Sequence, residues 1–163
     1  MAGNKKPRKA YKPKGFLVDP IRYTLNSIAM ASAHKSAYLG LKIQAHSSMT
    51  AVIQGKATRD DMDILVNMFN MVDALCRMRI GKEYYEQVKV GQGALRTAIE
   101  RGLARGDRFI LTGPEISAIN AVIELHDAQL EVATVGDLGR ACDMVANVVK
   151  SGGAHRLTSS AAA

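Results

Sequence analysis

Apolar residues recur every three or four positions along most of the chain, and no stretch of useful length alternates apolar and polar residues. The first spacing places apolar side chains on one face of an α-helix, whereas a half-buried strand needs alternation with period two. The sequence therefore predicts an all-α protein. Because connections of about two to eight residues favour antiparallel neighbours, we expect five or six helices in an antiparallel bundle or in stacked helical hairpins, preceded by a disordered basic N-terminal arm.

Capping residues and glycines set the expected helix boundaries. Asp19-Pro20 predicts a helix start, and the pattern that follows to about Gln54 is long enough to predict a break near residues 33–40. Two later helices are expected over about residues 59–80 and 82–105. Another begins after Thr112, and the last begins after Thr134 and ends at Ser151-Gly152-Gly153. In the last of these, the side chains expected to face inward are Leu138, Ala141, Cys142, Val145 and Val148 or Val149.

Composition divides the chain into three parts. Residues 1–15 have no aliphatic side chain larger than Ala after Met1, so they cannot bury enough apolar surface to offset the entropy of ordering. We therefore expect a disordered cationic arm over residues 1–18, a helical domain over 19–151 and a flexible tail over 152–163.

Length and composition exclude some classes of protein. The chain has 163 residues, of which 47% are hydrophobic, enough for a substantial core. No apolar run approaches the roughly 18 to 20 residues of a membrane-spanning helix, so a membrane protein is not expected. Cys76 and Cys142 each lie in an apolar helical pattern, and we expect reduced, buried thiols in a cytoplasmic protein.

The formal net charge of +7 is unevenly distributed. Residues 1–14 carry six basic residues and no acid, whereas residues 15–163 carry 16 basic and 15 acidic residues. Within the body, residues 20–59 hold five cations and no anion, while 109–149 hold six acids and one cation. Blocks of alternating sign predict a two-faced surface or segments that pair with each other in the fold.

The arm is the clearest functional element of the sequence. Its lysines and arginine can contact phosphates and Tyr11 can stack on a base, which is typical of a flexible nucleic-acid tether of low sequence specificity. A solubilising basic tail and a short import signal at residues 5–9 stay open as alternatives. The candidate nucleic-acid contacts are Lys5, Lys6, Arg8, Lys9, Tyr11, Lys12, Lys14, Arg22, Lys35 and Lys42.

Catalytic and metal motifs are not found. No His-x3-His, Cys-x2-Cys or Glu-x2-His spacing occurs, and the glycines near residues 91–93 and 102–106 fall within or at the end of helical patterns, where helix packing or termination explains them. His126 next to Asp127 is a possible proton-transfer pair, although a core histidine is the favoured interpretation. The sequence therefore predicts a non-enzymatic protein without cofactor or metal.

A second hypothesis is a protein-binding accessory factor or a host-directed inhibitor, with a host or phage protein as partner or a second copy of the chain in a homo-oligomer. Methionines can form an adaptable binding groove, although core packing explains them more simply. The residues of this alternative interface are Met62, Met68, Met71, Met78, Glu124, Asp127 and Glu131.

Several short sequence segments resemble those of a known group of proteins. They are the arm at residues 6–14, the helix cap Ala57-Thr58-Arg59-Asp60-Asp61, the helix start Gly113-Pro114-Glu115, and residues 125–130 followed by Ala133-Thr134-Val135. Together they resemble short uncharacterised basic helical proteins of tailed phages and prophages. The resemblance implies a phage accessory role in the cytoplasm of a bacterial host cell, and it transfers no catalytic residue.

Overall fold

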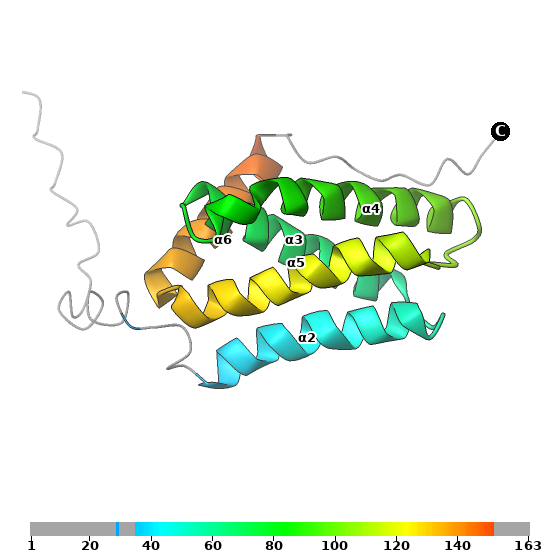
Figure 1. Cartoon of the computed structure of the whole chain (residues 1–163), viewed down its shortest axis with the longest axis horizontal. Helices are drawn as coiled ribbons and strands as arrows, with labels where there is room; N and C mark the ends of the chain where they lie inside the picture. The colour runs from blue at the N-terminus through cyan, green and yellow to red at the C-terminus, as the bar shows by residue number, and fades with distance from the viewer. Residues whose placement is uncertain (1–28, 30–34, 152–163) are drawn as a thin grey trace, which may run out of the picture.

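The computed structural model describes residue 29 and residues 35–151, which form five α-helices and one short 3-10 helix and no strand. In chain order these elements are α2 (Lys35–Ile53), α3 (Arg59–Arg77), η2 (Lys82–Tyr84), α4 (Tyr85–Leu103), α5 (Gly113–Val132) and α6 (Val135–Lys150). Figure 1 shows α2, α4 and α5 lying lengthwise, with α6 crossing one end of them. The all-α prediction is confirmed. The cationic arm, the helix predicted at Asp19-Pro20 and the C-terminal tail lie outside the described residues.

Three threonines begin α3, α5 and α6, as the capping pattern predicts. Each has an acid three positions later whose carboxylate accepts the threonine backbone N–H, at 2.8 Å for Thr58, 2.7 Å for Thr112 and 2.9 Å for Thr134. At Thr58 and Thr134 the threonine hydroxyl oxygen accepts the backbone N–H of that acid in return. These boxes satisfy backbone donors that a helix start leaves without partners.

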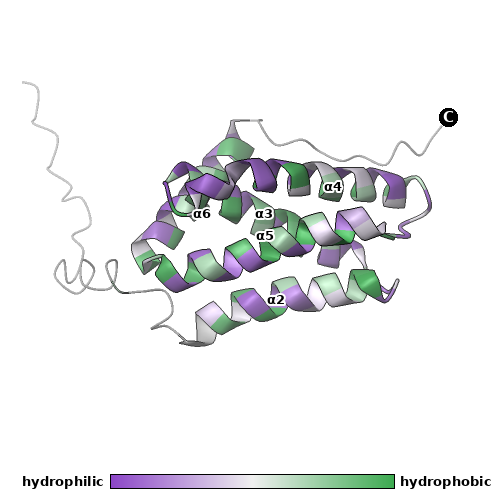
Figure 2. Cartoon of the chain, in the orientation of Figure 1, coloured by the Kyte–Doolittle hydropathy of each residue, from purple (hydrophilic) through white to green (hydrophobic). Residues whose placement is uncertain are grey.

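Helix α3 is the centre of the core, because it packs against α2, α4, α5 and α6. Leu65, Val72 and Leu75 on this helix are completely buried. Figure 2 shows hydrophobic residues spread over all the helices rather than collected on one of them. The apolar circumference of α3 is covered mainly by the chain's own helices α2, α4, α5 and α6.

Helices α4 and α5 approach closely at Gly91. A side-chain carbon built at this glycine would lie 2.7 Å from Val122 and 2.8 Å from the Phe69 ring, closer than van der Waals contact allows. Gly93, two positions later in the same helix, has no neighbouring atom within 4 Å. Helix packing therefore explains Gly91, while Gly93 only lowers the helix propensity of an exposed position.

The predicted end of α3 is wrong by three residues. The helix was expected to reach Ile80, but it ends at Arg77, and Gly81 with a left-handed φ of +77° precedes the short helix η2. A side chain at Gly81 would also crowd Leu125 and Gln129, which lie 3.1 and 3.2 Å away. The chain therefore turns tightly against α5 before α4 begins.

The predicted inner face of α6 is only partly correct. Ala141 is buried and Leu138 and Val145 are half-buried, but Cys142 is exposed, as are Val148 and Val149. The reason is tertiary: α6 packs mainly against α3. Helical spacing alone does not reveal that one neighbouring helix covers less of this surface than two would.

The two glycines of α4 give a matched test of packing. We expect Gly91→Ala to lower the free energy of unfolding by about 1 to 3 kcal/mol, because the added methyl overpacks the contact with Phe69 and Val122. Gly93→Ala should raise it by about 0.5 to 1 kcal/mol, because alanine costs less entropy in an open helical position. Urea unfolding of both variants checks this, and equal effects of the same sign would contradict the packing.

Candidate nucleic-acid interface

Most of the predicted phosphate contacts lie outside the described residues. This group comprises Lys5, Lys6, Arg8, Lys9, Tyr11, Lys12, Lys14 and Arg22. Lys35 begins α2, where the structure describes its backbone. Of the predicted nucleic-acid contacts, Lys42 is the one whose side chain the structure describes.

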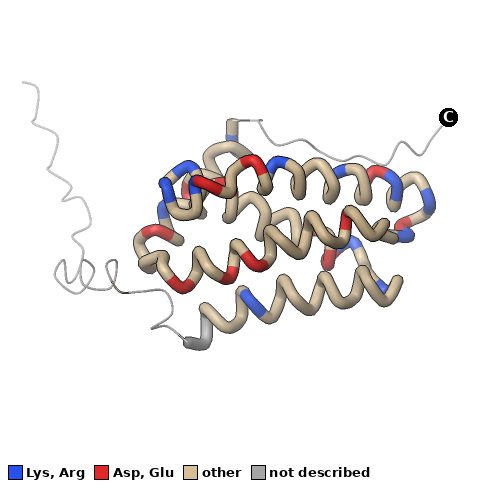
Figure 3. Tube along the Cα trace, in the orientation of Figure 1, with Lys and Arg blue, Asp and Glu red and all other residues tan. Residues whose placement is uncertain are grey.

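Lys42 faces another part of the protein rather than open solvent. Its ammonium lies 3.1 Å from the Glu131 carboxylate on α5 and 4.8 Å from the centre of the Tyr38 ring. One turn further along α2, His46 Nε2 lies 2.9 Å from Asp127 Oδ2. Figure 3 shows the acidic side of α5 next to α2. The prediction that oppositely charged segments pair in the fold is confirmed for these helices, and Lys42 is occupied by that pairing.

Ion pairs hold seven of the 13 lysines and arginines whose side chains are described. Besides Lys42, six arginines and lysines lie within 3.1 Å of a carboxylate: Arg59, Arg77, Lys89, Arg96, Arg101 and Arg140. The strongest geometry is at Arg101, which contacts both Glu115 oxygens at 2.9 and 2.6 Å and lowers the pKa of that carboxyl to about 2. Bidentate pairs of this kind fix side-chain positions as well as charge.

Six cations have described side chains and no ion pair within the described part of the chain: Lys56, Arg79, Lys82, Arg105, Arg108 and Lys150. They lie mainly at the two ends of the bundle. Lys56, Arg105 and Arg108 belong to the loops α2–α3 and α4–α5, which the Arg59–Asp107 ion pair joins at one end. Arg79 and Lys82 lie in the α3–α4 turn at the opposite end.

The α3–α4 turn is held in place by a buried glutamine. Gln129 of α5 donates through Nε2 to the Ile80 carbonyl at 2.7 Å and to the Cys76 sulfur at 3.3 Å. Its side chain is buried, so these bonds are shielded from water. Gln129 thereby ties the turn to α5. This contact fixes the backbone from which the side chains of Arg79 and Lys82 extend.

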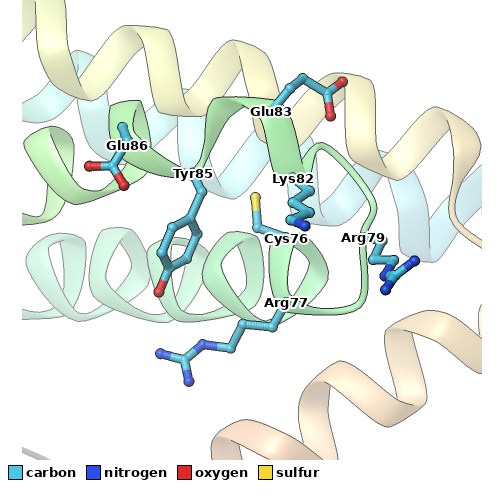
Figure 4. A pocket seen from close by; sticks show the side chains of 7 residues that line it. All are labelled: Cys76, Arg77, Arg79, Lys82, Glu83, Tyr85 and Glu86. Carbon is cyan, nitrogen blue, oxygen red and sulfur yellow. The ribbon is translucent and has the colours of Figure 1, made fainter.

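A cavity of about 400 Å³ opens beside this turn (Figure 4). Its lining combines cations, carboxylates, one aromatic ring and one thiol: Cys76, Arg77, Arg79, Lys82, Glu83, Tyr85 and Glu86. Burial raises the pKa of the Cys76 thiol, which also donates to the Gly81 carbonyl at 3.3 Å. A neutral, hydrogen-bonded thiol is a poor nucleophile, so the cavity is better suited to binding than to covalent chemistry.

Arg79 has a strained backbone. It follows α3 with a left-handed φ of +71°, its N–H donates to Cys76 at 2.9 Å, and the next N–H donates from Ile80 to Leu75 at 2.9 Å. This pair of hydrogen bonds is a Schellman helix end, in which the left-handed position usually belongs to glycine. An arginine there costs about 1 to 2 kcal/mol of backbone strain. Strain held at an exposed charged residue indicates a use for its side chain.

Sequence reasoning did not group Arg79, Lys82 and Tyr85 into one site. The available signal was the group of three cations at residues 77–82, but the pattern assigned the first four of these positions to a continuing helix. The side chains of Arg79, Lys82 and Tyr85 line one cavity only because α3 ends at Arg77 instead of continuing to Ile80.

The alternative protein interface loses part of its expected surface. Met62 and Met68 are buried in the core, while Met71 and Met78 are partly buried beside α6. On the acidic face, Asp127 pairs with His46 and Glu131 with Lys42, which leaves Glu124 exposed without an ion pair in the described ranges. These residues do not form one continuous surface.

His126 lies in the core with an incomplete hydrogen-bond network. Its side chain is 3% exposed, Nδ1 has no hydrogen-bond partner, and the Asp127 oxygen nearest to it is 4.0 Å away. Burial lowers the pKa of this imidazole to about 4, so it is neutral at pH 7. His46, on the other side of Asp127, was not selected from the sequence because no spacing relates positions 81 residues apart.

No family model, curated protein or solved structure matches this chain. Among residues 29 and 35–151, no group of three or more His, Cys, Asp or Glu side chains is placed to hold a metal ion. No helix of the same ranges is long and apolar enough to cross a membrane.

The strain at Arg79 predicts that Arg79→Gly stabilises the fold. Glycine relieves the left-handed backbone strain, but it loses more conformational entropy on folding than arginine does. The net effect is a rise of about 0.5 to 1 kcal/mol in the free energy of unfolding. Thermal or urea unfolding measures it. Arg105→Gly is the matched control because Arg105 carries no left-handed strain, and it should not stabilise. A destabilised Arg79→Gly variant would mean that the arginine side chain holds the turn.

Burial of His126 predicts a stability loss in mild acid. Its folded-state pKa of about 4 lies below the ordinary value of 6.5, so the unfolded chain takes up the proton first and stability falls as the pH decreases through this window. We expect wild type to lose roughly 2 kcal/mol more than His126→Gln between pH 7 and pH 4.5 in urea unfolding. His46→Gln is the exposed control, and identical pH profiles for wild type and His126→Gln would refute the assignment.

Proposed function

We propose that this protein is a non-enzymatic, phage-type accessory protein that associates with nucleic acid through its cationic N-terminal arm. The phage setting and the bacterial cytoplasm enter this proposal through the sequence resemblance alone. The arm contacts phosphates and supplies most of the attraction, and the helical body carries it.

One observation supports the proposal above the others: the body is electrically balanced. Residues 35–151 contain 14 basic and 14 acidic residues, and seven of these cations lie in ion pairs. Residues 1–14 contain six cations and no acid. A polyanion is therefore attracted to the arm rather than to the body as a whole.

One residue that precedes α2 is placed against the start of α6. The Ala29 carbonyl accepts the backbone N–H of Val135 at 2.8 Å. The arm contributes phosphate contacts to the proposed binding, and such contacts give little readout of bases.

A charge-matched comparison tests this proposal. The arm variant changes Lys5, Lys6, Arg8 and Lys9 to Gln, and the body variant changes Lys56, Arg105, Arg108 and Lys150 to Gln. Both full-length proteins lose four positive charges. For a DNA duplex, the arm variant should lower the slope of log affinity against log salt by about 3 to 4, because each phosphate contact contributes about 0.9.

The body variant should change this slope by less than about 1. Fluorescence anisotropy with a labelled duplex over a salt series gives both values, and circular dichroism confirms that the variants fold. An equal loss in the two variants would show that total charge matters and that the arm has no special role.

A further inference from the structure

The cavity beside the α3–α4 turn is large enough for a small ligand. Its volume of about 400 Å³ lies within the range of small-ligand pockets. Arg79 and Lys82 offer cations without a carboxylate partner in the described structure, and Tyr85 offers an aromatic ring. These are the groups that hold a phosphate and an unstacked base.

Charge at the cavity is mixed rather than uniformly positive. Arg77 is held by Asp73 at 2.7 Å, and Asp73 also binds Lys89 at 3.1 Å, so one carboxylate is shared between two cations. Glu83 and Glu86 line the same cavity. Figure 4 shows Glu83 on the far side of the turn from the Arg77 guanidinium and the Tyr85 hydroxyl.

Mixed charge discriminates between ligands. A cavity with two carboxylates is unsuitable for a general polyanion, which would meet repulsion along with attraction. A single nucleotide unit suits it better, because its phosphate needs cations while the amino groups of its base need acceptors. Carboxylates accept such amino groups, as Glu and Asp do from cytosine.

The stacking surface requires an unpaired base. The ring of Tyr85 is half-buried, and the Lys89 ammonium lies 4.9 Å from its centre. A base stacks on an aromatic ring only when it has left its own helical stack, which a single strand permits and an intact duplex resists.

The cavity also lies at the end of the bundle where α6 begins. Gln129 of α5 binds the turn at Ile80, and α6 begins shortly after α5, where Val135 donates to Ala29. Figure 1 shows the α3–α4 turn and the start of α6 at the same end of the molecule.

From these contacts we infer that the α3–α4 cavity binds one unpaired nucleotide of a single-stranded nucleic acid. Arg79 and Lys82 bind its phosphate, Tyr85 stacks on its base, and Glu86 accepts from the base edge. This inference rests on the proposed function and narrows its ligand from nucleic acid in general to single strands. It also gives a role to the strained backbone of Arg79.

The experiment compares full-length variants on a mixed-sequence DNA strand of about 12 nucleotides and on the duplex formed with its complement. The site variant is Arg79→Gln with Lys82→Gln, and its charge-matched control at the opposite end is Arg105→Gln with Arg108→Gln. We expect the site variant to lose about tenfold in single-strand affinity and to lower the salt slope by about 1.4, since each contact on a single strand contributes about 0.7. The control should lose less than about threefold.

Stacking is tested separately at Tyr85. Tyr85→Leu should lose about tenfold in single-strand affinity, within the range of one lost base stack, and change duplex affinity by less than twofold. Tyr85→Phe keeps the ring and should bind as wild type. Circular dichroism checks folding. If Tyr85→Leu is destabilised, the double variant Arg79→Gln with Lys82→Gln still tests the cavity, because both of its positions are exposed.

Two results would overturn the cavity site: equal losses in the two charge-matched double variants, or equal losses on strand and duplex. The arm variant distinguishes this failure from failure of the proposed function. If the arm variant loses binding while both double variants behave alike, the arm proposal stands and the cavity does not bind nucleotides. If the site variant loses binding while the arm variant does not, the arm proposal fails and the cavity remains a single-strand site.

Discussion

Burial of α3 is the constraint on which the rest of the fold depends. Four other helices pack against it, and its inward residues contribute much of the apolar surface removed from water, the main favourable term in folding. Gly91 brings α4 to the Phe69 ring of this helix, and Gln129 ties its C-terminal end to α5. Packing of the other helices around α3 therefore sets the positions of the loops at both ends of the bundle.

Charge is organised separately from the core. Pairing between α2 and α5, through Lys42 with Glu131 and His46 with Asp127, places cations of one block of the sequence against acids of another. Surface pairs of this kind contribute little stability, commonly under about 1 kcal/mol each. Together with the other ion pairs they belong to a body in which basic and acidic residues balance, while residues 1–14 carry six cations and no acid.

The α3–α4 turn depends on core packing for its backbone and carries surface charge on its side chains. Its backbone is set by packing, since Gly81 lies against Leu125 and Gln129. Its surface carries Arg79 in a conformation that glycine would adopt at lower energy. Glycine at this position would therefore lower the backbone energy of the turn.

The sequence by itself determined the helical class and the three threonine caps, because helical spacing and capping are local properties of neighbouring residues. It also separated a basic arm from a balanced body, since charge counts need no coordinates. Tertiary structure was needed to end α3 at Arg77, to expose Cys142, to bury Met62 and Met68, and to bring His46 to Asp127. Each of these depends on which helix covers which face, and contacts between residues far apart in the chain leave no periodic signal along it.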